Sequence, residues 1–201
     1  MHRQRVERVL SEEIRERFSK AMDAAVAAGE PEPTAMVLGT SDREGNISTR
    51  AVLLKSIDER GFVFYTNTLS HKGQQLQILP RAAITFFWKA TVNQVHASGS
   101  IERVSDAEAD AYFASRDRGS QVGAWASRQS KVLESREVLE QRVREFEEKF
   151  AGRDVPRPPH WSGYRLLPET VEFWHGREFR LHDRFRYTQQ DDAWTVDRLY
   201  P

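Results

Sequence analysis

The chain has 201 residues, of which 39% are hydrophobic and 30% are charged, and its 30 Lys and Arg residues balance 30 Asp and Glu residues. A net charge of zero argues against a general nucleic-acid binder, and no apolar run approaches the roughly 18 residues that a membrane-spanning helix needs. Cysteine is absent, which excludes disulfides and thiolate-bound metals, and the charged first twenty residues are unlike a secretory signal, so we expect a cytoplasmic protein.

The first half of the chain predicts a helix followed by short strands. Apolar residues recur at three- and four-residue steps from Val6 to Val26, which is typical of an amphipathic helix. Gly29 and the Glu30–Pro33 segment end that helix. Runs of β-branched and aromatic residues between turn signals then predict strands. The expected strands are 35–39, 47–55, 61–66, 82–88 and 93–104, and Pro80 ends an expected helix over 70–79.

The second half predicts three helices and then strands again. Ser105 and Glu108 form a capping-box pattern, so a helix begins there and runs to about Ser115. Further helices are expected over 120–126 and from Ser135 to Phe150. The expected strands are 163–167, 170–174, 180–187 and 194–199. Because strands and helices do not alternate, the order favours an α+β fold with a closed or split antiparallel β-barrel and peripheral helices. We expect an N-terminal helix and linker over residues 1–32 and one domain over 33–201.

Two segments carry cations that suit an anion. On a strand, Arg180, His182 and Arg184 would share one face and would repel one another unless an anion lay among them; a solvated edge strand explains the pattern about equally well. Arg50 and Lys55 fall on opposite faces by parity, so they serve one ligand only if a bulge or the strand end redirects one of them. Taken alone, this segment is more simply interpreted as a core strand with charged ends.

Two further segments place polar groups at helix ends. Ser70 and Lys72 at a helix start suit a phosphate, because free N–H groups lie there, although an ordinary Ser N-cap is the simpler interpretation. Residues 112–121 and 125–130 combine hydroxyls, arginines and amides near helix ends, which again suits an anion; a polar connection between helices is the alternative interpretation. No metal site is expected, because the six His residues are scattered, and no GxSxG, P-loop or GxGxxG motif occurs.

Taken in order, these segments resemble the pyridoxine/pyridoxamine 5′-phosphate oxidase family from about Pro33 to Pro201. Each motif alone is weakly specific, and the ordered set is strongly specific. The matching segments are Arg50-Ala-Val-Leu-Leu-Lys55, Phe64-Tyr-Thr-Asn67, Ser70-His-Lys72, Gln94-Val95, Tyr112-Phe-Ala-Ser-Arg116, Ser120-Gln-Val-Gly-Ala-Trp125, Arg128-Gln-Ser130, Glu172-Phe-Trp174, Arg180-Leu-His-Asp-Arg184 and Arg198-Leu-Tyr-Pro201.

The resemblance implies an FMN-binding split barrel, a homodimer with two flavins at its interface, and no nucleic-acid or membrane partner. It implies oxidation of pyridoxine or pyridoxamine 5′-phosphate to pyridoxal 5′-phosphate, with molecular oxygen as acceptor and hydrogen peroxide as product. The implied FMN contacts are Arg50, Ala51, Val52, Leu53, Leu54, Lys55, Tyr65, Thr66, His71, Lys72, Gln94, Gln129, Ser130, Trp174 and Arg184. The implied substrate contacts are Lys55, Tyr112, Arg116, Ser120, Arg180 and His182, with Arg180 and His182 as the catalytic candidates beside the reacting carbon.

Three departures from the family pattern weaken the prediction of the substrate more than the prediction of FMN. His71 stands where the family usually has Arg, Asn93 stands where Arg is common, and the basic Arg-Arg-x-Asp-Leu segment near the N-terminus is absent. Two alternatives stay open, namely an FMN-dependent oxidase of phenazine precursors and a non-catalytic flavin- or haem-binding split barrel. The intact Leu54-Lys55 and 112–121 segments favour the vitamin B6 substrate over the first. The joint presence of substrate-side cations argues against the second.

Overall fold

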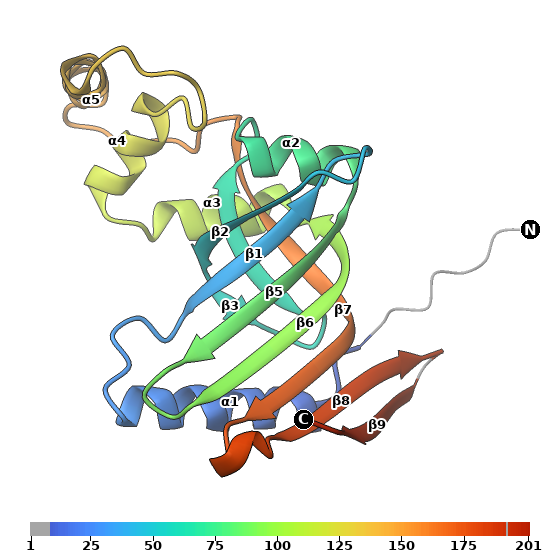
Figure 1. Cartoon of the computed structure of the whole chain (residues 1–201). Helices are drawn as coiled ribbons and strands as arrows, with labels where there is room; N and C mark the ends of the chain where they lie inside the picture. Colours follow the sequence, from blue (N-terminus) through green and yellow to red (C-terminus); the bar gives the residue numbers. More distant parts are fainter. Residues whose placement is uncertain (1–8, 192) are drawn as a thin grey trace, which may run out of the picture.

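The computed structural model describes residues 9–191 and 193–201. Its centre is one antiparallel sheet, strongly curled, with the strand order β2-β1-β5-β6-β7-β4-β3 and with β8 and β9 added along β7 (Figure 1). The strands are β1 (Ala35–Ser41), β2 (Ile47–Leu53), β3 (Ser56–Ile57), β4 (Phe62–Asn67), β5 (Arg81–Trp88), β6 (Asn93–Arg103), β7 (Trp161–His175), β8 (Asp183–Gln190) and β9 (Ala193–Leu199).

Strand β7 is long enough to pair with two different strands along one edge. Its first half pairs with β4 and its second half pairs with β8, while β6 runs along its other edge. β3 follows β2 directly in the chain and pairs with β4, so the two ends of the strand order lie close together and the sheet curls into a barrel. The expected α+β split barrel is confirmed.

The helices cover the barrel from two sides (Figure 1). They are α1 (Glu12–Ala27), α2 (His71–Ile78), α3 (Asp106–Ala114), α4 (Arg118–Ala126) and α5 (Arg136–Lys149), with a 3₁₀ turn at Glu178–Arg180. α1 lies across the lower end of the sheet, α2 and α3 lie at its upper end, and α4 and α5 form a lobe beyond them. Among the described residues, no helix is long and apolar enough to cross a membrane.

An aromatic cluster fills the barrel and attaches α1 to it. The Phe18 ring of α1 lies 5.3 Å from Phe62 and 5.1 Å from Phe86, in edge-to-face contacts. Phe18, Phe62, Phe86 and Trp88 are all buried. Burying each such side chain stabilises the fold by roughly 1.5–3 kcal/mol, so α1 is part of the core packing.

The structure corrects three details of the predicted elements. Val9 and Leu10 precede α1, because the Ser11 side chain caps the helix by accepting the N–H of Ile14, and Val6 lies outside the described residues. The strands predicted over 163–167 and 170–174 are one strand, β7, which Pro168 does not interrupt. The pairing register with β6 shifts there, since Ser98 pairs with Thr170 and Gly99 with Pro168, so a bulge in β7 at Glu169 accommodates the proline without its N–H.

The third correction concerns the strand predicted over 180–187, which begins at Asp183. His175 pairs with Asp183, so the residues between them form the connection of an antiparallel hairpin. Phe179 and Arg180 have positive φ angles of 57° and 61° there, which a strand does not allow. Arg180 and His182 therefore do not share a strand face with Arg184.

Candidate functional site

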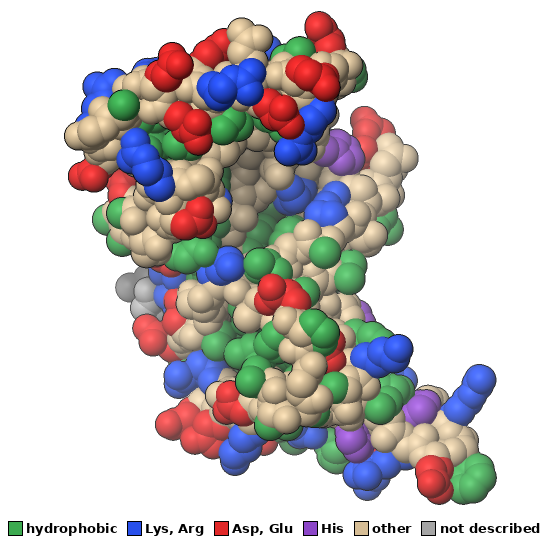
Figure 2. All heavy atoms as spheres, turned by 90° about the vertical axis from the view of Figure 1, so that its left-hand side faces the viewer, with side chains coloured by type: hydrophobic (Ala, Val, Ile, Leu, Met, Phe, Trp, Pro, Cys, Tyr) green, Lys and Arg blue, Asp and Glu red, His purple; other side chains and the backbone are tan. Residues whose placement is uncertain are grey.

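A cavity of about 790 Å³ lies where the ends of β2 and β4 meet the start of α2 and the α3–α4 corner. In Figure 2 the molecule is hollowed below the lobe of α4 and α5, and Lys and Arg side chains gather beside the hollow. The lining residues are Ala51, Val52, Leu53, Lys55, Tyr65, Thr66, Asn67, Lys72, Tyr112, Ser115, Arg116, Asp117, Ser120, Gly123, Ala124, Ser127, Gln129 and Trp161.

Lys72 occupies the upper end of this cavity with only neutral partners. The Ser70 side chain caps α2 by accepting the N–H of Gly73, which places Lys72 in the first helical turn. Its Nζ atom donates to Thr66 Oγ1 at 3.1 Å and to Gln129 Oε1 at 3.2 Å. Burial, with the nearby charge of Arg50 as the second cause, lowers the pKa of Lys72.

Arg50 is a second cation without an acidic partner beside Lys72. Its guanidinium donates to Leu38 O, to Thr40 Oγ1 at 2.6 Å and to Ser48 Oγ at 2.6 Å. Among the residues that the structure describes, no carboxylate lies within ion-pair distance of either cation. Two partly buried cations that lack a counter-charge at a helix N-terminus form a site for a strongly charged anion.

The donor set at this end of the cavity fits a phosphate group such as that of FMN. At the α2 N-terminus the Gly73 N–H donates to the capping Ser70 side chain, and the loop after α4 folds over the helix start, so that Ser130 Oγ accepts the N–H of His71 at 3.2 Å. Gln129 from the same loop reaches Lys72. Arg50, Lys72 and these hydroxyl and amide groups together offer the charge and the donors that a phosphate needs.

A third cation, Arg116, lies at the α3–α4 end of the cavity beside Asp117, and it forms no ion pair with any described residue. Its guanidinium lies 5.0 Å from the centre of the Trp161 ring, and one of its Nη atoms is buried without a hydrogen-bond partner. Burial lowers the pKa of Arg116. Lys55 and Ser120 line the same cavity. This arrangement offers a second anion subsite within one cavity.

Three aromatic rings lie nearly parallel at the wall of the cavity. The Tyr65 ring lies 4.0 Å from Tyr112 and 5.1 Å from Trp161, with interplanar angles of 17° and 12°. Gly163 pairs with Tyr65 across β4 and β7, and a Cβ atom there would lie 2.7 Å from the Tyr65 ring. Burial, followed by the charge of Glu108, raises the pKa of Tyr65 to about 12. The rings thus form an aromatic wall that is uncharged at neutral pH, which suits an aromatic ligand.

Five other implied residues lie away from this cavity, toward the other end of the sheet. Phe87, Gln94, Trp174 and Arg184 form one cross-strand row from β5 to β8. Gln94 and Trp174 line a separate cavity of about 260 Å³, and Arg184 donates to Glu172 at 2.8 Å. This end of β7 lies at the opposite end of the molecule from α2 and α4 (Figure 1).

Arg180 and His182 belong to the same outlying group. The His182 ring lies 4.4 Å from the Trp174 ring, and its Nδ1 atom accepts the N–H of Arg177 at 3.1 Å. We call Gln94, Trp174, Arg180, His182 and Arg184 the hairpin group. One chain thus carries two separate sets of candidate site residues.

The structure therefore sorts the implied residues into several classes. Eleven line the large cavity: Ala51, Val52, Leu53, Lys55, Tyr65, Thr66, Lys72, Tyr112, Arg116, Ser120 and Gln129. Arg50, His71 and Ser130 lie beside its phosphate end, and Leu54 is buried in the core. β2 ends at Leu53, so Lys55 lies beyond the strand and the alternation of side chains along β2 no longer fixes its direction. The strand end can therefore redirect Lys55 toward the same ligand as Arg50.

Sequence reasoning missed Trp161 in the wall and Thr40, Ser48 and Gln75 behind Arg50. Gln75 Oε1 accepts from both Thr40 and Ser48, so it supports the two hydroxyls that hold the guanidinium. Ser48 carried a usable signal, because it lies two residues from Arg50 and shares its strand face. Trp161 carried none, since only the pairing of β4 with β7 brings it to the cavity.

Comparisons with known proteins assign the chain to a family. Residues 22–150 match the family model described as pyridoxamine 5′-phosphate oxidase, and residues 161–201 match the pyridoxine 5′-phosphate oxidase C-terminal dimerisation region. The chain belongs to the pyridoxamine 5′-phosphate oxidase family. The expected family is thereby confirmed, and this oxidase-family chain is an enzyme of the flavin oxidoreductase class.

Relatives of this oxidase-family chain are similar over nearly its whole length. A pyridoxine/pyridoxamine 5′-phosphate oxidase of Myxococcus xanthus is 54% identical over 186 residues, which cover 92% of this chain and 90% of that protein. The protein of the same name from Rubrobacter xylanophilus is 53% identical over 184 residues, which cover 92% and 85%.

Two solved structures are similar to this one. PhzG from Burkholderia lata, in complex with tetrahydrophenazine-1-carboxylic acid, has a TM-score of 0.88 and 33% identity over 92% of this chain and 91% of that chain. A pyridoxamine 5′-phosphate oxidase-related, FMN-binding protein from Nostoc punctiforme has a TM-score of 0.75 and covers 96% of this chain and 99% of that one. At 17% identity the second supports the fold alone.

Proposed function

We propose that this chain is an FMN-dependent oxidase that converts pyridoxine or pyridoxamine 5′-phosphate to pyridoxal 5′-phosphate, with oxygen as acceptor and hydrogen peroxide as product. With pyridoxamine 5′-phosphate, water hydrolyses the oxidised amine and ammonia leaves. The observation that carries the proposal is a single cavity with two cationic ends, Arg50 with Lys72 and Lys55 with Arg116, which form no ion pairs among the described residues, beside a wall of stacked aromatic rings. Two phosphate-bearing planar ligands, a flavin and a vitamin B6 phosphate, match that arrangement. The names of the relatives support the same substrate.

In this proposal each end of the cavity has its own task. Arg50, Lys72 and Ser130 hold the FMN phosphate at the α2 N-terminus, and Lys55, Arg116 and Ser120 hold the substrate phosphate. FMN, when bound, supplies the acceptor for a hydride equivalent from the substrate. Tyr65 and Tyr112 exclude water and orient the substrate ring, and Arg180 and His182 approach the reacting carbon.

We further propose a homodimer in which the hairpin group of one chain completes the cavity of its partner. The match of residues 161–201 to a dimerisation region supports this assembly. Val37, Leu53 and Phe87 are exposed apolar residues on the same outward face as Gln94 and Trp174. In a two-fold symmetric dimer this apolar patch would pack against the same patch of the partner. The same contact would bury these side chains and complete the cavity of each chain.

Peroxide release tests the proposed activity. The purified protein is expected to be yellow, with FMN that acid precipitation releases, and to form peroxide on addition of pyridoxine or pyridoxamine 5′-phosphate. Pyridoxamine without its phosphate is the matched control and should react far more slowly, because Lys55 and Arg116 then lack their anion. A colourless protein that does not take up FMN would refute the proposal.

A phenazine precursor is the second candidate substrate, because PhzG has the similar structure with a bound phenazine derivative. Tetrahydrophenazine-1-carboxylic acid would offer one carboxylate in place of a phosphate. If the protein oxidises that compound and forms no peroxide with either vitamin B6 phosphate, the proposed substrate is wrong and the proposed cofactor stands.

Hybrid dimers test whether two chains build each site. Arg116→Ala and Arg180→Ala homodimers should both be weakly active. Mixing and reassembling them in equal amounts should restore about a quarter of wild-type activity, since half of the dimers are hybrids with one intact site in two. Light scattering should report a dimer throughout. Activity that stays at the level of the parents would show that both residues act in the same chain.

A further inference from the structure

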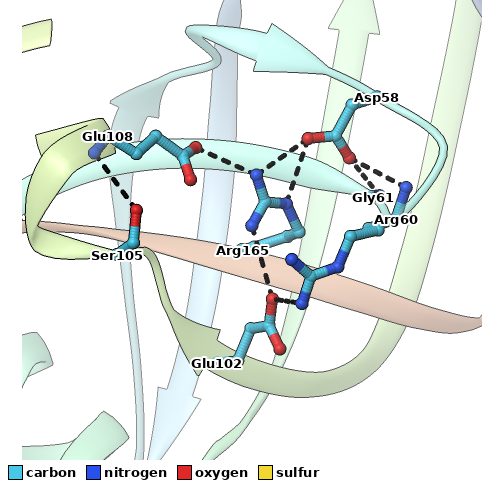
Figure 3. A network of polar contacts seen from close by, with 7 residues as sticks. All are labelled: Asp58, Arg60, Gly61, Glu102, Ser105, Glu108 and Arg165. Atoms are coloured by element: carbon cyan, nitrogen blue, oxygen red, sulfur yellow. Dashed lines mark hydrogen bonds and ion pairs between the residues drawn. The ribbon is translucent and has the colours of Figure 1, made fainter. Parts of the chain in front are cut away.

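Arg165 of β7 is a buried cation at the centre of a network that the proposed chemistry does not use (Figure 3). Its side chain is 5% exposed and ion-pairs with three carboxylates. Figure 3 shows that they come from three segments: Asp58 from the turn before β4, Glu102 from β6, and Glu108 from α3. Arg60 pairs with Glu102 as well.

The geometry of the network makes Arg165 a rigid anchor. Nη2 lies 2.8 Å from Asp58 Oδ2 and 2.9 Å from Glu108 Oε1, and Nη1 lies 3.3 Å from Glu102 Oε1. Asp58 is itself fixed, because its Oδ1 accepts the N–H groups of Arg60 and Gly61. A buried guanidinium held on several sides has little freedom to move, so the segments that it joins keep a fixed relative position.

Glu108 links Arg165 to the helix that borders the cavity. It lies in the first turn of α3, where its N–H donates to the capping Ser105 side chain. Tyr112 follows it by four residues and lies on the same face of the helix. Arg116 follows the end of α3, and both side chains line the cavity. The ion pair between Glu108 and Arg165 therefore holds α3 against the sheet, and α3 carries the substrate side of the cavity.

Other contacts also hold α3: Ala109 and Phe113 are buried, and Arg103 pairs with Asp106 at 3.7 Å. Arg157, from the connector before β7, pairs with Asp106 at 2.9 Å and with Asp110 at 2.5 Å. Those two carboxylates are largely exposed, and exposed pairs contribute little. Arg165 is the buried partner, and the negative charge that it holds at Glu108 also acts on Tyr65 in the aromatic wall.

We propose that Arg165, acting through Glu108, is a positioning residue for the substrate: it sets the place of Tyr112 and Arg116 without touching the ligand. The inference rests on the proposed function, because it assigns the substrate phosphate to the α3–α4 end of the cavity. The FMN phosphate lies at the α2 end, where no member of the network contributes a contact.

A matched pair of variants tests this role. Glu108→Gln and Glu102→Gln each remove one carboxylate charge from the same guanidinium, but only Glu108 lies on α3. Glu108→Gln should raise the KM for pyridoxamine 5′-phosphate and the Kd for pyridoxal 5′-phosphate about tenfold, because small displacements of positioning groups are costly. Glu102→Gln should change both by less than about twofold. Neither should change FMN retention.

Coupling to Tyr112 separates positioning from a general loss of stability. In a Tyr112→Phe background, Glu108→Gln should cost less than it does alone, because residues that act as one unit are non-additive. Equal effects of the two Glu variants on KM, additive effects with Tyr112→Phe, or loss of FMN from Glu108→Gln would each overturn the proposal.

Hydrogen exchange gives a readout that does not depend on the substrate. Amide exchange over residues 110–116 should accelerate in Glu108→Gln and stay unchanged in Glu102→Gln. A wild-type protein that oxidises neither vitamer and does not bind pyridoxal 5′-phosphate would refute the proposed function. The exchange comparison would still decide whether Arg165 fixes α3, and equal exchange in both variants would refute that role.

Discussion

Replacing Lys72 with methionine is expected to weaken FMN binding by about ten- to a hundredfold, which corresponds to roughly 1.5–3 kcal/mol for a hydrogen bond to a charged group. Lys72 Nζ contacts only hydroxyl and amide oxygens within the described chain, so an anion is the partner that its charge lacks. Methionine keeps the apolar stem and removes the ammonium. Fluorescence titration of the apoprotein with FMN measures the change.

The same variant should leave the stability of the apoprotein unchanged or raise it. The lowered pKa of Lys72, caused by burial and then by Arg50, means that the folded apoprotein holds the lysine proton less well than the unfolded chain does. At neutral pH the charged lysine therefore costs folding free energy, which Lys72→Met removes. Lys89→Met, in the exposed turn after β5, is the control. Normal FMN affinity in Lys72→Met would refute the assignment of this end of the cavity.

Replacing Arg180 with alanine is expected to reduce kcat/KM for the phosphorylated vitamer by about ten- to a hundredfold while FMN stays bound. Arg180 lies in the hairpin between β7 and β8 with a positive φ of 61°, a conformation that costs a non-glycine residue about 1–2 kcal/mol. A strained arginine in an exposed connection suggests a role outside its own chain. Steady-state kinetics and the flavin absorbance of the same sample measure both quantities.

Arg43→Ala, in the exposed turn between β1 and β2, is the control for removal of a surface arginine. Arg180→Lys keeps the charge without the planar fork, so partial activity is expected from it. The roles of the two residues would be interchanged if Arg180→Ala lost FMN while Lys72→Met kept FMN bound and showed only slower turnover.

Much of the local structure follows from short-range signals. The capping residues Ser70 and Ser105 predict the starts of α2 and α3, and both side chains accept the expected N–H. Runs such as Phe62–Asn67 form strands because β-branched and aromatic side chains suit a half-buried pleated surface. The division of the chain at residue 32 and the cytoplasmic location stay predictions.

The hairpin at 176–182 is a segment where short-range signals predict the wrong structure. Phe179 and Leu181 favour a strand by composition, but β7 and β8 are antiparallel neighbours and the residues between His175 and Asp183 are needed to reverse the chain. The tertiary pairing outweighs the local preference, because strand propensity depends on the neighbours that a strand finds. The parity argument that joined Arg180 to Arg184 fails for that reason.

By itself, the sequence determined which residues carry charge, which periodicities bury a face, and which ordered motifs identify the family. Only the tertiary structure decided that Lys72, Arg116 and Trp161 border one cavity while Trp174 and His182 lie toward the opposite end of the molecule, because strand order and register set which distant residues meet. The missing counter-charges of Arg50 and Lys72 were equally invisible in the sequence. An ion pair, or its absence, depends on distances between segments that are far apart along the chain.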